Sequence, residues 1–351
     1  MNEKIDIRSM LPEELTEYFA TLGEPKFRAK QVFPRLMKGE RISEITNLSK
    51  ALRERLEDQT LDTLPAVEEK YVSQIDGTVK YLFKLYDGAC IESVFMKYKH
   101  GNTLCISSQV GCRMGCKFCA STIGGRDRDL LPSELLGQII AAELDSGERV
   151  SNIVMMGIGE PLDNYDNVIK FLKLVNHPDG INIGYRHISL STCGVVPKIR
   201  ALAEVDIPIT LSISLHAATD EKRSEIMPVN NKWKIAELLS ACVDYYKVTG
   251  RRISFEYTLI FGKNDSEEDA KELAALLKNA FRGTGAPIHV NLIRVNEVAE
   301  TGFKKGSDES AKAFAATLEK QGVVATVRRR LGADVNAACG QLRRKAQQNN
   351  T

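Results

Sequence analysis

Three cysteines in one short segment have the clearest chemical potential in this sequence. Cys112, Cys116 and Cys119 follow a C-x3-C-x2-C spacing, so one loop can turn all three thiolates toward a single metal centre. A structural zinc loop usually needs a fourth protein ligand and commonly two C-x2-C pairs, and no second pair is present. Three cysteines suit a [4Fe–4S] cluster that leaves one iron open for a small ligand. A zinc loop and a buried apolar trio are the alternatives, and the interleaved Arg113 and Lys117 disfavour the second.

Further polar candidates follow apolar segments later in the chain. In Met156-Gly-Ile-Gly-Glu-Pro161 the glycines let the backbone approach a ligand, and the Glu160 carboxylate can accept hydrogen bonds from an ammonium group. Ser191 and the segment from Ser214 to His216 offer hydroxyl and imidazole groups. Taken alone, such residues are more often turn, core or surface residues, so their weight depends on the fold.

The segments that must position these residues alternate between strands and helices after Gly101. Repeated strand–helix units predict a parallel sheet with right-handed crossovers, closed into a full or partial barrel. Active sites in barrels lie at the carboxyl ends of the strands. The expected strands are 103–107, 152–156, 187–191, 210–215, 254–260, 289–294 and 323–328, and helices are expected over 132–144, 165–175, 234–246, 266–280 and 308–320.

The first hundred residues have a different pattern. Pro12 and Glu24-Pro25 each begin a short predicted helix, and residues 42–58 form a third. Residues 78–85 and 91–96 carry β-branched and aromatic residues around Asp87-Gly88, which predicts a β-hairpin. We therefore expect a helical accessory domain over 1–62, a β connector over 63–100 and a catalytic core over 101–351.

Composition excludes several classes of protein. The 351 residues are 43% hydrophobic and 27% charged, which is ordinary for a globular chain and unlike a disordered or fibrous one. The net charge is only +2, so any nucleic-acid surface must be local. Apolar runs are too short for a membrane span, and Met1-Asn2-Glu3-Lys4 does not begin a secretory signal. A cytoplasmic location with reduced cysteines is expected.

Six motifs in order resemble the RlmN/Cfr family of radical S-adenosylmethionine (SAM) RNA methyltransferases. The resemblance covers nearly the whole chain and implies a partial (β/α)6 radical SAM barrel. The Ala-Ser-Thr-Ile-Gly-Gly stretch resembles the enzymes that methylate adenine C2 more than those that methylate C8. The motifs are Cys105-Ile-Ser-Ser-Gln-Val-Gly-Cys112, Cys119-Ala-Ser-Thr-Ile-Gly-Gly125, Met156-Gly-Ile-Gly-Glu-Pro161, Ser191-Thr-Cys-Gly194, Ser214-Leu-His216 and Asp334-Val-Asn-Ala-Ala-Cys-Gly-Gln-Leu342.

The resemblance implies a role for each candidate residue. Cys339 would carry a methyl group from one SAM, a second SAM would yield the radical that activates this group, and a transient disulfide with Cys105 would release the product. Glu92 would take the C2 proton, although a carboxylate in a β context is usually a solvated edge charge. Cys112, Cys116 and Cys119 would hold the cluster. SAM contacts are implied for Gly159, Glu160, Ser191, Ser214, Leu215, His216 and Asn296.

The same resemblance implies the partners. The substrates would be an adenine of 23S rRNA in the peptidyl-transferase centre and the adenine 3′ of the tRNA anticodon, with flavodoxin or ferredoxin as electron donor and the enzyme acting as a monomer. A Cfr-like C8 methyltransferase and a non-catalytic iron–sulfur RNA-binding module are the alternatives. Candidate phosphate contacts are the basic residues between Lys26 and Arg41, the runs 328–330 and 343–345, and residues 97–100.

Overall fold

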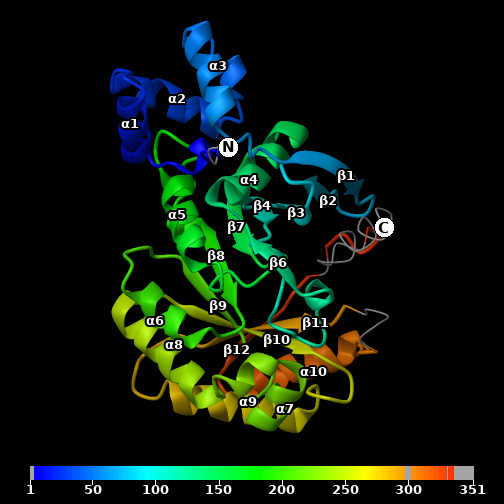
Figure 1. Ribbon diagram of the computed structural model, residues 1–351. Helices are drawn as coiled ribbons and strands as arrows, with labels where there is room; N and C mark the ends of the chain where they lie inside the picture. The colour runs from blue at the N-terminus through cyan, green and yellow to red at the C-terminus, as the bar shows by residue number, and fades with distance from the viewer. Residues whose placement is uncertain (1–3, 297–301, 330, 336–351) are drawn as a thin grey trace.

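A ten-stranded sheet forms the centre of the computed structural model, which describes residues 4–296, 302–329 and 331–335 (Figure 1). The strands lie in the order β1-β2-β3-β4-β7-β8-β9-β10-β11-β12. Their bounds are β1 Ala66–Val72, β2 Val79–Lys84, β3 Cys90–Tyr98, β4 Gly101–Cys105, β7 Val150–Met155, β8 Ile188–Thr192, β9 Thr210–Ser214, β10 Ile253–Leu259, β11 His289–Arg294 and β12 Val324–Val327.

The strands from β4 to β12 pair in parallel. Six of them are followed by one or more helices before the chain enters the next strand of this sheet. β12 is added as a seventh parallel strand. This arrangement confirms the expected partial (β/α)6 barrel. The helices are α4 Pro132–Ser146, α5 Tyr165–Asn176, α6 Val196–Ala203, α7 Asp220–Ile226, α8 Ile235–Thr249, α9 Glu267–Ala280 and α10 Asp308–Lys320.

Alternation along the strands separates two faces of the sheet. In β8, Ile188, Leu190 and Thr192 are buried, whereas Ser189 and Ser191 are half-buried. The apolar side chains pack in one continuous core with the helices. The serines face the barrel lumen, where Ser189 Oγ lies 3.2 Å from Ser212 Oγ of β9. A barrel interior is normally filled by branched apolar side chains, so this polar lumen indicates a binding function.

The expected hairpin is confirmed as β2 and β3, which pair antiparallel. It does not stand apart, because β1 pairs with β2 and β3 pairs antiparallel with β4. The three strands therefore extend the parallel sheet at its β4 edge. The outer strand β1 is exposed along its whole length and carries Glu68, Glu69 and Lys70, charges that protect a sheet edge from pairing with other chains.

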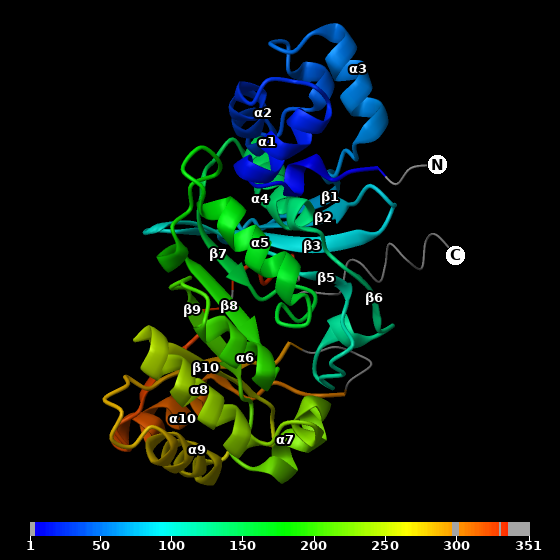
Figure 2. The ribbon, with the colours of Figure 1, turned by 60° about the vertical axis from the view of Figure 1, so that its left-hand side comes forward.

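Three helices form the N-terminal end of the molecule: α1 Pro12–Thr21, α2 Phe27–Met37 and α3 Lys50–Gln59. Figure 2 shows them at one end of the molecule, with α7, α9 and α10 at the other. The single helix expected over 42–58 is wrong. A 3-10 turn spans Ile42–Glu44, and α3 begins only after Ser49, whose side chain accepts a hydrogen bond from the Leu52 amide and caps the helix.

A hydrogen-bonded junction attaches these helices to the barrel. The Asp6 carboxylate accepts a 2.7 Å hydrogen bond from Ser133 Oγ at the start of α4, and the Ser133 amide donates to Ser9 Oγ.

In the described part of the chain, no helix is long and apolar enough to cross a membrane.

Candidate functional site

The residues singled out in the sequence gather at the carboxyl ends of the parallel strands. The cysteine loop follows β4, the glycine segment follows β7, and Ser191 and Ser214 end β8 and β9. Because the strands are parallel, these ends meet at one edge of the sheet. Asn296 follows β11 and is exposed, directly before the undescribed residues 297–301.

The cysteine loop is framed by a two-stranded ribbon that the sequence analysis did not anticipate. Strands β5 Gln109–Gly111 and β6 Arg126–Asp129 pair antiparallel on either side of it. The Cys112 amide donates to the Gly125 carbonyl at 2.8 Å, and the Lys117 amide donates to the Ile226 carbonyl at 2.9 Å. The loop is therefore anchored both to its own ribbon and to the end of α7.

The three thiols interact electrostatically with one another. Burial raises the pKa of the Cys112 thiol to about 12, and burial together with the charges of Cys119 and Cys112 raises the pKa of Cys116. Thiols in this environment become thiolates only when a bound cation compensates their charge. The donor set therefore fits a cationic iron–sulfur centre.

The spacing of the donors bears on the kind of centre. Among the described residues, no group of three His, Cys, Asp or Glu side chains closes around a single metal ion. A mononuclear zinc site needs such convergence, with each sulfur about 2.3 Å from the metal. In a [4Fe–4S] cluster each cysteine binds a different iron, so the sulfurs stand further apart. Three cysteines therefore suit a [4Fe–4S] cluster, in which each would bind a different iron, better than a zinc site, which usually takes four protein ligands.

The glycines after β7 serve the packing of two loops. A Cβ atom at Gly157 would lie 2.6 Å from the Ile106 carbonyl oxygen, and one at Gly159 would lie 2.7 Å from the Gln109 amide nitrogen. Gly159 also has φ +106°, which side chains rarely tolerate. The close approach is therefore to the chain itself, and a contact between Gly159 and SAM stays a prediction.

Glu160 is buried and already holds two backbone groups. Its Oε1 accepts from the Leu162 amide at 3.0 Å, and its Oε2 accepts from the Cys193 amide at 2.7 Å. Burial raises the pKa of this carboxyl. Each carboxylate oxygen has two acceptor positions, so a ligand ammonium can still bind, and it would favour the ionised form.

His216 connects the end of β9 to the cysteine loop. Its ring packs edge-on against Phe118 with centroids 4.9 Å apart, and its Nδ1 accepts from the Thr258 amide at 2.9 Å. With Nδ1 accepting, the neutral ring carries its proton on Nε2 and can donate to a ligand. Burial, assisted by the charge of Arg223, lowers the pKa of His216 to about 3.

This environment predicts a pH-dependent stability. The unfolded chain takes up a proton on His216 below its ordinary pKa of 6.5, whereas the folded chain does so only near 3. The stabilising contribution is therefore complete above 6.5 and declines as the pH falls toward 3. Between pH 7 and pH 5 we expect the free energy of unfolding to lose about 2 kcal/mol through this group.

Urea unfolding of the wild type and His216→Asn at both pH values measures this contribution. Asparagine is the matched control because it does not titrate and tolerates φ +59°, the backbone conformation at position 216. Equal losses in the two proteins would contradict the prediction.

Arg223 is a site residue that the sequence analysis missed. It is buried on α7 and donates to the carbonyls of Cys193 at 2.7 Å, Ser214 at 3.1 Å and Leu215 at 3.0 Å. It therefore joins the ends of β8 and β9, and it also interacts electrostatically with Cys116. No sequence signal marks it, because an arginine in a short charged helix is usually a surface residue.

Glu92 and Cys105 lie on adjacent strands. Val94 is the β-sheet partner of Cys105, so Glu92, two residues before Val94, projects from the same face of the sheet as the thiol. Glu92 is fully buried and forms an ion pair with Lys80, whose Nζ lies 3.0 Å from Oε2. The solvated edge charge is thus excluded, and Lys80 is a further residue that the sequence analysis missed.

Cys339 lies outside the described residues, but the segment leading to it is placed. Leu331 packs against the cluster of Val94, Met96 and Cys105. Asp334 accepts a 2.6 Å hydrogen bond from Ser73 Oγ in the β1–β2 turn. Val335, the last described residue, precedes Cys339 by four positions. Four residues of fully extended chain span at most roughly 14 Å.

The proposed phosphate contacts are only partly available. On α2, the expected core residues Ala29, Val32, Phe33, Leu36 and Met37 are buried. Arg28 and Arg35 form ion pairs with Glu24 and Glu40, whereas Lys26, Lys30 and Lys38 are exposed. Arg330, Arg343, Arg344 and Lys345 lie outside the described residues.

Comparison with known proteins identifies the family. Residues 106–274 match the Radical SAM superfamily, and residues 5–61 match the Ribosomal RNA large subunit methyltransferase N-terminal domain. The probable dual-specificity RNA methyltransferase RlmN of Alkaliphilus oremlandii is 55% identical over 99% of this chain and 100% of its own. The protein of that name from Clostridium botulinum strain Eklund 17B is 55% identical over 95% of this chain and 94% of its own. The chain belongs to the RlmN family.

The RlmN family membership agrees with the three-dimensional comparison. A radical SAM methyltransferase from Sphaerobacter thermophilus superimposes with a TM-score of 0.90 at 38% identity, covering 96% of this chain and 98% of the other. The chain is therefore a SAM-dependent RNA methyltransferase of the radical SAM superfamily. That superfamily implies a [4Fe–4S] cluster and SAM as cofactors.

Proposed function

We propose that this RlmN-family enzyme methylates adenine C2 in 23S rRNA and in tRNA next to the anticodon. The observation that carries the proposal is the joint placement of two groups of residues. The three-cysteine loop follows β4, and Cys105 and Glu92 lie on one face of β4 and β3 directly before it. The relatives, which are named dual-specificity RNA methyltransferases, support the choice of substrates.

Each cofactor has identifiable protein groups. Cys112, Cys116 and Cys119 would bind three irons of the cluster, and Glu160, Ser191, Ser214, Leu215, His216 and Asn296 would hold SAM. When bound, the cluster would supply an electron, and SAM would supply a methyl group and a radical. Two SAM molecules would be used per turnover. Flavodoxin or ferredoxin would provide the electron. The enzyme would be a cytoplasmic monomer. Its chain would divide into a helical accessory domain over 1–62, a β connector over 63–100 and a catalytic core over 101–351.

Direct methyl transfer would join two electron-poor carbons, because adenine C2 lies between two ring nitrogens. Cys339 would solve this problem by carrying the methyl carbon as a thioether until the carbon is joined to C2. Glu92 would then accept the C2 proton, and the unpaired electron of the adduct would have to return to the cluster, which supplies one electron for each SAM cleaved. The Cys105 thiolate would attack the Cys339 sulfur, forming a disulfide and leaving the electron pair of the broken S–C bond on carbon, which a proton completes. An external thiol reductant would restore both thiols.

The Glu92–Lys80 pair predicts separable effects on stability and turnover. Glu92→Gln removes the carboxylate that pairs with the buried Lys80 ammonium, so we expect it to lower the free energy of unfolding by about 3–5 kcal/mol. Loss of the base should reduce turnover by about 10² to 10⁴. The double variant Lys80→Met, Glu92→Gln removes the charge and should regain most of the stability without regaining turnover.

Denaturant unfolding and single-turnover kinetics of the two variants separate these effects. Wild-type turnover in the stable double variant would show that Glu92 has only a structural role.

Analysis of the modified nucleoside tests the proposed function. RNA treated with the anaerobically reconstituted enzyme, SAM and a reductant is digested and examined by mass spectrometry. The expected product is 2-methyladenosine. Formation of 8-methyladenosine would support a Cfr-like activity instead, and unmodified RNA together with uncleaved SAM would support a non-catalytic iron–sulfur protein.

A further inference from the structure

The turn between β1 and β2 binds the end of the described chain. Ser73 Oγ donates to Asp334 Oδ1 at 2.6 Å, and the Gln74 amide donates to Asp334 Oδ2 at 2.8 Å. In the opposite direction, the Gly332 amide donates to Asp76 Oδ2 at 2.9 Å. Three hydrogen bonds therefore join two segments that are up to 261 positions apart in the sequence.

Residues 73–77, which we call the docking turn, have the donors of a carboxylate site in place. Ser73 is buried, and its Oγ accepts from two amides of its own turn at 3.2 and 3.3 Å. The one proton of this hydroxyl is therefore directed to Asp334. The Ser73 amide donates to the Thr78 carbonyl at 2.8 Å, which closes the turn through its own backbone.

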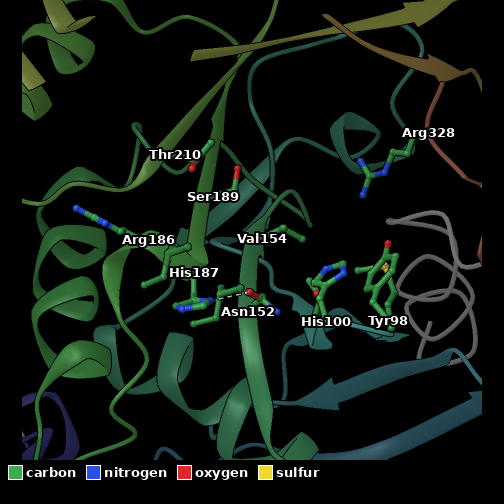
Figure 3. Close-up of a pocket in the computed structure, with 13 residues that line it drawn as sticks. Tyr98, His100, Asn152, Val154, Arg186, His187, Ser189, Thr210 and Arg328 are labelled. Atoms are coloured by element: carbon green, nitrogen blue, oxygen red, sulfur yellow. Dashed lines mark hydrogen bonds between the residues drawn. The ribbon is translucent and has the colours of Figure 1, made fainter. Parts of the chain in front are cut away.

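Leu331 determines the face of the sheet over which the C-terminal segment passes. Its side chain packs against the buried cluster that contains Cys105. Tyr98 and Val154 pack against the same cluster, and Figure 3 shows both beside a pocket in the barrel lumen. Residues 331–335, which we call the docked segment, therefore begin on the face that carries the Cys105 thiol.

The strand register places the docking turn at the level of Cys105. Val79, the first residue of β2, pairs with Phe95 of β3, and Phe95 pairs with Leu104 of β4. Neighbouring strands lie about 4.8 Å apart, so Val79 is roughly 10 Å from Leu104, the residue before Cys105. The four positions after Val335 span at most roughly 14 Å, which is comparable with this separation.

We propose that the docking turn positions the methyl carrier, because it holds the docked segment where Cys339 can reach Cys105. The proposal deepens the proposed function and rests on its disulfide step. Ser73 and Asp334 act through Cys339 and are positioning residues. Anchoring the chain a few positions before one thiol raises its effective concentration at the other, because the remaining loop is short.

Equilibrium oxidation of the cluster-loaded enzyme, without SAM or RNA, measures this effective concentration. Intact mass first confirms that Cys339 is unmethylated. In oxygen-free mixtures of reduced and oxidised glutathione, the thiols of Cys105 and Cys339 form a disulfide while one oxidised glutathione is reduced to two thiols. Alkylation followed by peptide mass spectrometry gives the fraction of enzyme that contains this disulfide.

Variants of the dock should lower the effective concentration and leave the iron content unchanged. Ser73→Ala should lower it roughly fivefold, the value of one hydrogen bond. Asp334→Ala loses two hydrogen bonds and should lower it at least as far. The double variant Ser73→Ala, Asp334→Ala should match Asp334→Ala alone, because both substitutions remove the same contact.

Gln74→Ala is the matched control within the docking turn. It keeps the backbone amide that binds Asp334 and removes only a side chain that donates to the Val72 carbonyl, so the effective concentration should not change.

An unchanged effective concentration in Asp334→Ala would overturn the dock. An equal loss in Gln74→Ala, or a wild type that forms no disulfide between Cys105 and Cys339, would also overturn it. This equilibrium does not depend on product formation. Failure of the proposed function would instead appear in the nucleoside analysis of the wild type, so the two failures are distinguishable.

Discussion

Replacing Cys339 by alanine is expected to abolish RNA methylation, with a loss of about 10³-fold or more in 2-methyladenosine formed per enzyme. The reason is that this variant lacks the sulfur that would carry the methyl carbon. Because the cluster residues are untouched, iron content should equal that of the wild type. Mass spectrometry of digested RNA measures the product.

A cysteine outside the proposed mechanism provides the matched control. Cys90 lies at the start of β3, two residues before Glu92, and Cys90→Ala should retain methylation. Methylation by Cys339→Ala at the wild-type rate would eliminate the carrier mechanism.

Replacing Cys105 by alanine should have a different result, because the methyl carbon can still be joined to adenine but cannot be released. Without the thiolate that attacks the Cys339 sulfur, RNA should remain covalently attached to the protein. A band containing both protein and labelled RNA should appear on a denaturing gel after a single turnover. Multiple turnover should fall about 10³-fold or more.

The double variant Cys105→Ala, Cys339→Ala is the control for this trap. It lacks the point of attachment and should give no covalent band. Released methylated RNA from Cys105→Ala at the wild-type rate would contradict the disulfide step, as would a covalent band in the double variant.

The sequence predicted the barrel well because its signals are local. The alternation of short apolar strands with amphipathic segments predicted seven parallel strands and five of the helices, whereas α6 and α7 were not predicted. Pro132 at the start of α4 and the 308–320 segment matched observed helices. The error over 42–58 arose because the apolar spacing continues across a turn, and only the Ser49 cap marks the true start of α3.

Contacts between distant segments could not be predicted in this way. The Lys80–Glu92 ion pair depends on the register of β2 against β3, and Arg223 becomes a site residue only because α7 packs beneath the ends of β8 and β9. Gly157 and Gly159 were interpreted as approaches to a ligand, whereas the structure shows two loops packed closely together. In each case the residue acts through a partner that is remote in sequence.

Mössbauer spectroscopy of the anaerobically reconstituted protein, with and without SAM, tests most directly whether three cysteines leave one iron open. The account predicts four irons per chain, a change at one iron when SAM is added, and loss of the cluster in Cys112→Ala. Zinc in place of iron, or four irons whose spectrum SAM does not alter, would contradict it.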